Sequence, residues 1–305
     1  MAEKVIIIGG TAAGLSAASK AKRVDPSLEI TVFERSGYIS YGACGLPYFV
    51  GGIIDQPDDL VSLNVDQMTN QRGVPTFIHH EVTSIDRTAQ TVTVRDLDSG
   101  KSWQQPYDKL VIATGAHAIV PDIPGADAEG VYTLRTVEDG IRLKSTVHGG
   151  EHKAIAIVGG GFIGLEMAEN LHAQGAKVSI VEMGNQVMAP IDFSMASLVH
   201  QHLMDKGVNL YLEQAVASFE RDGKGLKVIF KNGQSISADI VILSVGVRPE
   251  TTLARAAELK IGEAGGIAVN DYLQTSDESI YAIGDAIEFR HPITGKPWLN
   301  YLAGP

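Results

Sequence analysis

Two stretches of the chain share the same order of apolar, glycine-rich and alanine-rich positions. Each begins with a short run of mostly β-branched residues, at 5–8 and again at 154–158, and continues into a glycine-rich turn. Such continuous apolar runs are typical of parallel strands that are buried on both faces. An alanine-rich stretch follows each turn and predicts a helix, over about 15–24 and 165–174. The repetition predicts two separate βαβ units.

A second apolar run in each unit ends in an acidic residue. Glu34 lies 20 residues after Gly14, and Glu182 lies 18 residues after Gly164. Both separations are close to the roughly 20 residues that dinucleotide-binding folds place between the glycine loop and the acid that binds ribose. The pattern therefore predicts two dinucleotide sites.

The second glycine loop is a complete dinucleotide fingerprint, Gly159-x-Gly161-Phe162-Ile163-Gly164. The first glycine permits a tight turn, the second lets the backbone approach a pyrophosphate, and the third packs the helix on the strand. Glu182 can accept hydrogen bonds from ribose hydroxyls and would repel a 2′-phosphate, which favours NAD(H) over NADP(H). The alternative is a structural glycine turn followed by an exposed glutamate.

The first loop departs from the pattern. Its residues are Gly9, Gly10, Thr11, Ala12, Ala13 and Gly14, so threonine stands at the second glycine position. Glu34 supports the same ribose argument for an adenosine. Two such units, the first of them at the N-terminus, favour FAD plus NAD over two NAD molecules.

Other apolar runs predict the remaining strands. They lie at 76–95, 107–115, 238–246 and 280–285, and the segment 121–125 predicts a linker. We expect an α/β fold with two Rossmann-like dinucleotide-binding domains, each with a parallel sheet and a small antiparallel addition.

Cys44 lies in the segment Ser40-Tyr-Gly-Ala-Cys44-Gly-Leu-Pro47-Tyr48. A single cysteine is usually a small buried hydrophobe. The flanking glycines instead indicate tight backbone, and Pro47 suits a first helical turn, where the helix dipole favours a thiolate. From the residues alone, a buried cysteine and a reactive thiol both remain open.

Weaker candidates are histidine pairs and a basic cluster. His79-His80 and His200-x-His202 lack the other ligands of a metal site, so we expect no metal. Lys20, Lys22 and Arg23 form either a solvated helix face or an anion site. Asp285 is either a helix cap or an acceptor for a cofactor hydroxyl.

Composition limits the functional class. The 305 residues predict two domains, and the formal net charge of −11 argues against nucleic acid or an anionic membrane as the main partner. A single cysteine excludes an internal disulfide. No apolar run reaches the ~20 residues of a membrane span, and the N-terminus lacks a signal-peptide pattern, so we expect a cytoplasmic protein.

Taken together, these motifs resemble the pyridine nucleotide–disulfide oxidoreductase family over essentially the whole sequence. The resemblance implies an FAD-binding domain at 1–115 plus 246–305 and an NAD-binding domain at 116–245. It also implies that Asp285 contacts the flavin ribityl chain and that Glu166 lies near nicotinamide. Further cofactor-binding residues implied by the resemblance are Arg35, Ser40, Val82, Ala113, Thr114, Gly115, Gly246, Gly284 and Ala303.

The single cysteine is similar to one branch of that family. This branch contains coenzyme A disulfide reductases, NADH-dependent persulfide or polysulfide reductases, NADH oxidases and NADH peroxidases. The resemblance implies that Cys44 is the redox residue, and that Lys20, Arg23, Ser40 and Arg72 bind a coenzyme A-linked substrate.

Two departures keep the electron acceptor open. NADH peroxidases and many water-forming oxidases have a histidine where this chain has Ala12, which weakens the peroxidase interpretation. Coenzyme A disulfide reductases often have an asparagine where this chain has Ala43. The leading hypothesis is a reductase of a small disulfide or persulfide. The alternatives are an NADH oxidase that cycles Cys44 through a sulfenic acid, and a non-catalytic FAD/NAD electron-transfer or redox-sensing module.

The family is homodimeric, and we expect its C-terminal dimerisation domain, which follows the Leu302–Pro305 segment in the family, to be absent from this sequence.

Overall fold

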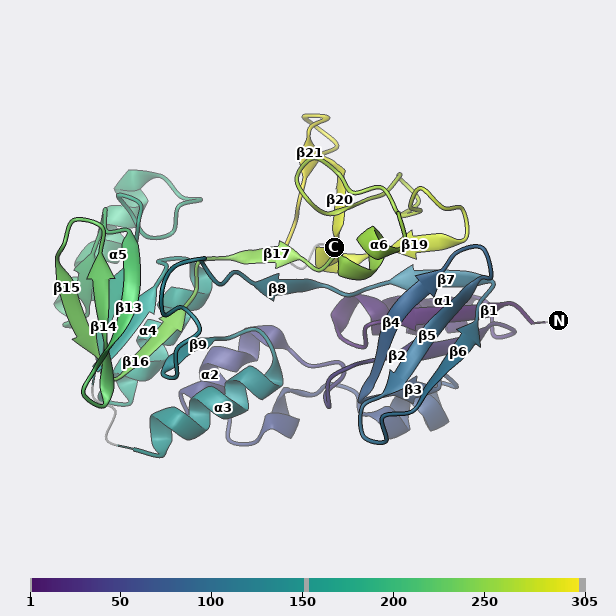
Figure 1. Cartoon of the computed structure of the whole chain (residues 1–305), viewed down its shortest axis with the longest axis horizontal. Coiled ribbons are helices and arrows are strands. Elements are labelled where there is room, and N and C mark those ends of the chain that lie inside the picture. Colours follow the sequence, from purple (N-terminus) through teal and green to yellow (C-terminus); the bar gives the residue numbers. More distant parts are fainter. Residues whose placement is uncertain (1, 151–153, 302–305) are drawn as a thin grey trace. The chain divides into compact units, whose positions relative to one another are not determined.

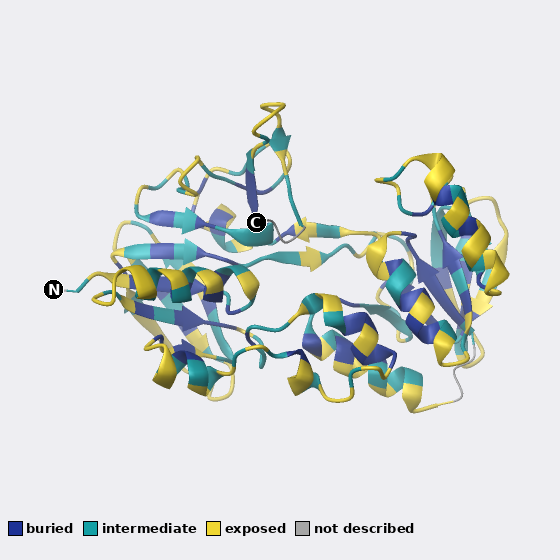
Figure 2. Cartoon of the chain, turned by 180° about the vertical axis from the view of Figure 1, so that it is seen from behind, coloured by how far each residue is buried: buried dark blue, intermediate teal, exposed yellow. Residues whose placement is uncertain are grey.

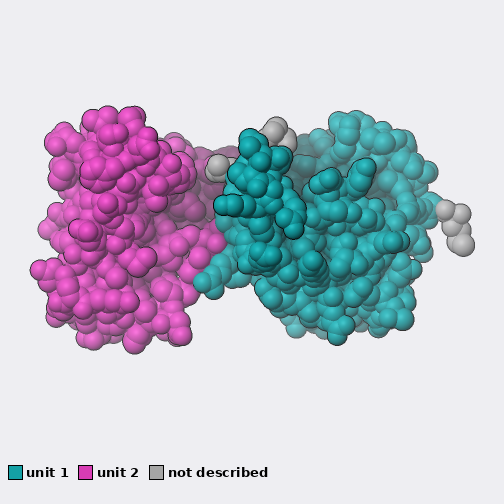
Figure 3. All heavy atoms as spheres, turned by 90° about the horizontal axis from the view of Figure 1, so that it is seen from above, with its two compact units in different colours: residues 1–42, 61–117, 248–305 teal, residues 43–60, 118–247 magenta. Residues whose placement is uncertain are grey.

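The computed structural model describes residues 2–150 and 154–301, and the chain divides into two compact units. Unit 1 comprises residues 1–42, 61–117 and 248–305, and unit 2 comprises 43–60 and 118–247 (Figure 3). The segment 43–60, which carries Cys44, makes its contacts within unit 2, whereas the division expected from the sequence places it in the first domain.

Unit 1 is built on a five-stranded parallel sheet of order β19-β7-β1-β2-β3 (Figure 1). Strand β1 lies at its centre, because its run of valine and isoleucine pairs with β2 on one side and β7 on the other. The elements of this layer are β1 (Lys4–Ile8), α1 (Ala12–Val24), β2 (Glu29–Phe33), β3 (Thr76–Phe77), β7 (Lys109–Ile112) and β19 (Ile280–Ala282).

Alternation along β1 sends its side chains into two separate cores. Val5 and Ile7 pack with Leu15 and Ala18 of α1, so the helix covers one face of the sheet. Ile6 and Ile8 face the other side.

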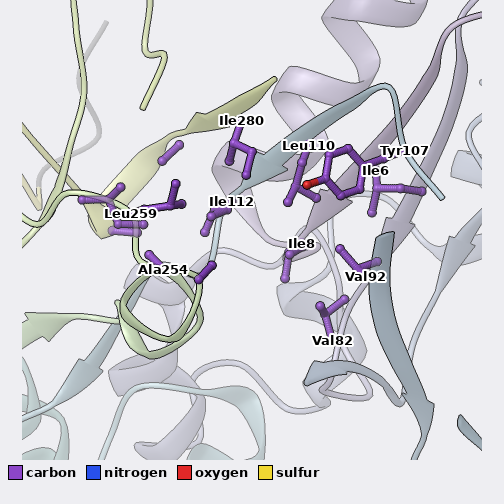
Figure 4. Packing of buried hydrophobic residues seen from close by; sticks show 14 of the residues in the cluster. Ile6, Ile8, Val82, Val92, Tyr107, Leu110, Ile112, Ala254, Leu259 and Ile280 are labelled. Carbon is purple, nitrogen blue, oxygen red and sulfur yellow. The ribbon is translucent and has the colours of Figure 1, made fainter. Parts of the chain in front are cut away.

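The core on that other side joins the parallel sheet to an antiparallel one. Val82 and Val92 of the sheet β4-β5-β6 pack against it, together with Leu110 and Ile112 of β7 (Figure 4). Burying both faces explains why the sequence shows continuous apolar runs rather than alternation. The antiparallel strands are β4 (His80–Asp86), β5 (Thr91–Asp96) and β6 (Ser102–Pro106).

Short elements complete unit 1. A three-stranded sheet has the order β18-β20-β21, and a two-stranded sheet pairs β17 with β8, two strands whose residues are divided between the units. Their bounds are β8 (Ala116–Ala118), β17 (Val247–Pro249), β18 (Ile267–Ala268), β20 (Ile287–Arg290) and β21 (Pro297–Trp298). The remaining helical segments are a π-helical turn η3 (Gln67–Gln71), α6 (Thr252–Ala256) and a 3₁₀ turn η4 (Gly284–Ala286).

Unit 2 repeats the plan with the parallel order β12-β11-β10-β16-β9. Ala156 and Val158 of β10 pack against Phe219, Val228 and Phe230 of an antiparallel sheet β13-β14-β15. The strands are β9 (Val131–Thr133), β10 (Ala154–Val158), β11 (Lys177–Val181), β12 (Asn209–Tyr211), β13 (Val216–Asp222), β14 (Gly225–Phe230), β15 (Ser235–Ala238) and β16 (Ile240–Leu243).

The helical segments of unit 2 include the one that follows Cys44. They are η1 (Ala43–Gly45), α2 (Leu46–Val50), η2 (Pro57–Leu60), α3 (Val137–His148), α4 (Phe162–Ala173) and α5 (Phe193–Asp205). Helix α2 packs against α3 and α4. Figure 2 shows buried positions concentrated on the strands and the inner helix faces.

The predicted fold class is confirmed, with one parallel sheet and antiparallel additions in each unit. Over the described ranges, no helix has the length and apolar character that a membrane span requires.

Candidate functional site

Both glycine loops turn sharply between strand and helix. Gly9 has φ +109° and Gly159 has φ +110°, in a region that favours glycine. A Cβ on Gly14 would overlap the carbonyl oxygen of Gly9, and a Cβ on Gly164 would overlap that of Gly159. The last glycine of each loop therefore lets the helix begin directly against the strand.

Each of the two predicted ribose-binding acids accepts one hydrogen bond from its glycine loop and one from a main-chain N–H that follows the acid. Glu34 accepts hydrogen bonds from the Gly10 N–H at 2.7 Å and the Ser36 N–H at 2.8 Å. The corresponding bonds to Glu182 come from the Gly160 and Gly184 N–H groups, both at 2.7 Å. Each carboxylate is thus fixed beside its loop, where a nucleotide ribose is expected.

The helix that follows each loop begins without a side-chain cap. Helix α1 starts after Thr11, whose side chain accepts no hydrogen bond from the described helix, and α4 starts after Gly161, which has no side chain to accept one. The first N–H groups of a helix have no intrahelical partner and bind anions well. No other atom of the described residues lies within 4 Å of a Cβ built on Gly161. In unit 2, the space beside Gly161 and the first N–H groups of α4 fit a pyrophosphate. In unit 1, the first N–H groups of α1 fit one.

Two further turns of unit 1 lie close to the first loop. The Ala113 N–H donates to the Ile8 carbonyl at 2.8 Å, which places the 113–115 turn beside the end of β1. A Cβ on Gly284 would lie 2.8 Å from the Cβ of Ala13, so η4, with Asp285, lies against the start of α1. These segments are distant in sequence and converge on one edge of the parallel sheet, where ligands of such folds bind.

The remaining cofactor predictions fall in varied environments. Thr114 Oγ1 donates to the Glu250 carbonyl at 2.6 Å, and Arg35 is exposed. The Val82 side chain is in the core, so only its main chain is left for a ligand. Gly246 has φ +105° in the turn between β16 and β17. Ala303 lies outside the described residues.

Three predicted substrate-binding cations line one cavity in unit 1. Lys20, Arg23 and Arg72 surround a space of about 400 Å³, together with Ser40. Arg72 is brought to α1 by a hydrogen bond from its Nη1 to Ser19 Oγ at 2.9 Å. None of the lining residues is acidic, so the cavity favours an anion. Its other lining residues are Ala12, Leu15, Ser16, Ser19, Tyr41, Gly42, Ser62 and Leu63.

Several of these lining residues are not among those predicted from the sequence. Ser16 and Ser19 share a face of α1 with Lys20 and Arg23, so the helical spacing of polar positions in an alanine-rich stretch is a usable signal. Ser62 reaches the cavity because its N–H donates to the Ser40 carbonyl at 2.9 Å. No local pattern indicates that pairing.

Cys44 is exposed, in the short 3₁₀ turn η1. The exposure excludes the buried-hydrophobe interpretation. Pro47 lies in the first turn of α2, as its sequence position suggests, but α2 has only five residues. In unit 2, Gly45 allows a close approach, since a Cβ there would lie 2.5 Å from Leu60 Cδ2.

Glu166 lies one turn into α4, and its pKa is raised by burial and by the nearby charge of Glu169. Two of the histidines considered as metal ligands illustrate that these side chains have other partners. His79 pairs with Asp98 at 3.1 Å, and His200 Nε2 accepts from the Val187 N–H at 3.1 Å. Among the described residues, no three His, Cys, Asp or Glu side chains are grouped to hold a metal ion.

Comparisons with known proteins agree with this geometry. The chain is 38% identical over 302 residues to the NAD(P)H sulfur oxidoreductase (CoA-dependent) of Pyrococcus abyssi, covering 99% of this chain and 66% of that protein. The structure of reduced Bacillus anthracis CoADR-RHD superposes with a TM-score of 0.96 at 39% identity, covering 99% of this chain and 54% of the other.

A third match is the water-forming NADH oxidase from Lactobacillus brevis bound to NADH. Its TM-score is 0.93 at 31% identity, covering 99% of this chain and 66% of that one. The chain thus spans between about half and two thirds of the length of these relatives. The family model described as pyridine nucleotide-disulphide oxidoreductase matches residues 3–299. The chain therefore belongs to the pyridine nucleotide-disulphide oxidoreductase family.

Proposed function

We propose that this chain is the dinucleotide-binding part of an FAD-dependent oxidoreductase that uses NADH to reduce a coenzyme A-linked disulfide or persulfide through Cys44. The cationic cavity of unit 1 is the observation that carries the proposal. Coenzyme A carries a diphosphate and a 3′-phosphate, and Lys20, Arg23 and Arg72 supply the charges that such groups require.

Unit 1 would hold FAD and unit 2 would hold NAD(H). The first glycine loop, Glu34 and the turns at 113–115 and 284–285 fit the FAD, and the second loop with Glu182 fits the NAD(H). When bound, the two dinucleotides supply the pair of electrons for the reaction. The chain's own residues orient the ribose and pyrophosphate groups and leave space for them.

Cys44 would supply the reacting sulfur. Its thiolate attacks the substrate disulfide, forms a mixed disulfide, and releases one thiolate. Two electrons and protons then reopen that bond, which regenerates Cys44 and releases the second thiol. Overall, one NADH and one proton reduce one disulfide to two thiols. With one cysteine in the sequence, no second internal thiol can resolve the mixed disulfide.

The cavity and Cys44 are neighbours along the chain. Gly42 lines the cavity, and Cys44 follows it by two residues. An extended chain covers at most about 7 Å over two residues. A short stretch of chain therefore joins the residues that would bind the phosphates to the thiol that would react.

The test compares two disulfides that differ in their phosphates. Coenzyme A disulfide carries them, and pantethine does not. We expect Lys20→Ala, Arg23→Ala and Arg72→Ala each to raise KM for coenzyme A disulfide about tenfold or more, as for a lost charge-assisted hydrogen bond. KM for pantethine should stay unchanged.

Cys44→Ser provides the second arm of the test. We expect NADH to reduce bound FAD in this variant while disulfide turnover disappears. Equal KM effects on both disulfides would exclude the cavity as the coenzyme A site. Turnover of disulfide by Cys44→Ser would exclude Cys44 as the redox group. Oxygen uptake without anaerobic disulfide turnover would assign the chain to the NADH oxidases instead.

A further inference from the structure

The segment that follows Cys44 is held by two helices of unit 2. Helix α2 has five residues, which is too short to be stable alone. Leu46 and Phe49 are 2% exposed and Val50 is fully buried, so packing fixes the helix. What it packs against therefore determines where Cys44, two residues before α2, is placed.

One face of α3 provides the first set of contacts. Gly140, Lys144 and His148 are spaced four residues apart and so lie on one side of the helix. A Cβ on Gly140 would lie 3.2 Å from atoms of Leu46 and Phe49, so the glycine permits close packing.

The two polar residues of this face bind main-chain carbonyls. Lys144 Nζ donates to the Ile54 and Asp55 carbonyls at 3.0 and 2.7 Å, and it lies 4.2 Å from the centre of the Phe49 ring. His148 Nε2 donates to the Val50 carbonyl at 2.9 Å.

One face of α4 provides the second set. Glu166 and Asn170 of α4 and Gln174, the C-cap residue that follows the helix, have the same four-residue spacing. Gln174 Nε2 donates to the Gly51 carbonyl at 2.7 Å. Asn170 is buried, and a Cβ on Gly51 would lie 2.7 Å from its Cβ. Asn170 Nδ2 donates to the Glu166 carbonyl at 2.8 Å. This side of α4 therefore connects the helix that begins at the second glycine loop to the C-terminal end of α2.

The side chains complete the hydrogen bonding at the end of α2. Within the segment, the Gly51, Gly52 and Ile53 N–H groups satisfy the carbonyls of Pro47, Phe49 and Tyr48. The next two carbonyls, of Val50 and Gly51, accept from His148 and Gln174 instead. Carbonyls at a helix C-terminus lack intrahelical partners, so these side chains act as external caps.

We propose that His148 and Gln174 are positioning residues that fix the Cys44 segment for electron transfer. The inference rests on Cys44 being the reacting thiol of the proposed function. Neither side chain needs to touch substrate or cofactor. Each hydrogen bond restricts the position of α2, which is too short to be stable alone. The bond from Gln174 also fixes α2 to α4, the helix that starts at the second glycine loop.

Gln174→Glu tests the proposal because it preserves size and replaces the donor with a carboxylate oxygen facing the Gly51 carbonyl. In the FAD-loaded chain, we expect kcat for coenzyme A disulfide to fall about fivefold, the effect of one lost hydrogen bond, with KM unchanged. Amide hydrogen exchange in residues 46–55 should accelerate by a similar factor. The long-wavelength band of the NADH-reduced protein, which reports thiolate against flavin, should weaken.

Matched variants separate positioning from general damage. Gln201 of α5 is exposed and donates to Asp205 at 2.7 Å, so Gln201→Glu makes the same chemical change away from the segment and should alter none of these readouts. His148→Ala should behave like Gln174→Glu, and His148→Gln, which retains an N–H donor, should restore most of the lost kcat.

Three results would overturn the proposal. The first is that amide exchange in residues 46–55 is unchanged in Gln174→Glu. The second is that this exchange is faster but kcat of Gln174→Glu equals that of Gln201→Glu. The third is that KM of Gln174→Glu changes as much as its kcat. Failure of the proposed function gives a different result whatever the exchange rates show, because either Cys44→Ser would retain disulfide turnover or the unsubstituted protein would consume oxygen without anaerobic disulfide turnover.

Discussion

Replacing Gly164 with alanine should destabilise unit 2, whereas the same change at Gly161 should not. A Cβ at Gly164 would overlap the Gly159 carbonyl oxygen and lie 2.7 Å from Ser244 Oγ. At Gly161, where φ is −80°, no other atom in the described part of the chain lies within 4 Å of the added carbon. The two positions belong to one loop and differ in what surrounds them.

The magnitude at Gly164 follows from two opposing effects. Alanine stabilises a helix interior by about 1 kcal/mol relative to glycine. Overpacking typically costs about 1–3 kcal/mol. Because the obstacle is a backbone carbonyl that no rotamer change can move, we expect a cost of about 3 kcal/mol. The net loss is then about 2 kcal/mol, or a Tm lower by about 4–8 °C.

Scanning calorimetry and NADH titration by fluorescence measure the two effects separately. Gly161→Ala should change the free energy of unfolding by less than about 0.5 kcal/mol. Its methyl group would occupy the space that a pyrophosphate needs, so NADH should bind about tenfold more weakly, or about 1.4 kcal/mol. A Gly164→Ala variant with wild-type Tm, or a Gly161→Ala variant with wild-type NADH affinity, would refute the reasoning.

Three other substitutions test charge and burial. Burial and the charge of Glu169 raise the pKa of Glu166 in the folded protein. The contribution of this group to the free energy of unfolding is therefore present at low pH and is lost as pH rises from its unfolded pKa through its folded pKa. In urea unfolding, Glu166→Gln should be more stable than wild type at pH 7 and should differ little from it at pH 4. Burial raises the pKa of Asp277, but hydrogen bonds from Ser279 and Arg87 outweigh it and hold the pKa below its usual value. That stability is present at neutral pH and lost as pH falls through the folded pKa, so Arg87→Met should destabilise the protein most at pH 7 and should flatten the acid side of a Tm–pH curve. Burial, followed by the charge of Asp277, raises the pKa of Tyr107 to about 12, and within the described chain its buried hydroxyl has no hydrogen-bond partner. Tyr107→Phe should therefore stabilise the folded protein by about 1 kcal/mol. A loss of stability of that size would instead indicate that the hydroxyl binds a buried water.

The parts of the fold that depend on local pattern were predictable from the sequence. The β-branched runs placed the central strands, and the glycine spacing placed both loops and the acids that follow them. Helix α1 begins at Ala12, three residues before the predicted start, because the helix begins within the glycine loop itself. Periodicity locates the middle of such a helix better than its first turn.

The parts that depend on distant pairings were not predictable. Arg72 reaches the cavity through Ser19, which lies 53 positions earlier. Ser62 arrives beside Ser40 because Tyr41 and Val61 form an isolated bridge. The family resemblance suggested Arg72, but no spacing in this sequence gives the reason for its position.

The contacts of residues 43–60 show the same limit. These residues follow the first βαβ unit directly, and sequence order places them with it. They pack with unit 2 because Gly140 leaves room for Leu46 and Phe49, and because Gln174 binds the Gly51 carbonyl. Each contact joins positions about a hundred residues apart, which a local pattern does not reveal.

The hydrogen bonds of Glu182 have a consequence for engineering coenzyme choice. Exchanging the acid for a neutral or basic residue is the obvious route toward a coenzyme with a 2′-phosphate. In this chain the same carboxylate also accepts from the Gly160 and Gly184 amides, so the exchange would leave two loop donors without their acceptor. A successful redesign needs a second substitution that restores a hydrogen-bond acceptor there. Variants changed at position 182 alone should have a less ordered loop without a changed preference between NADH and NADPH.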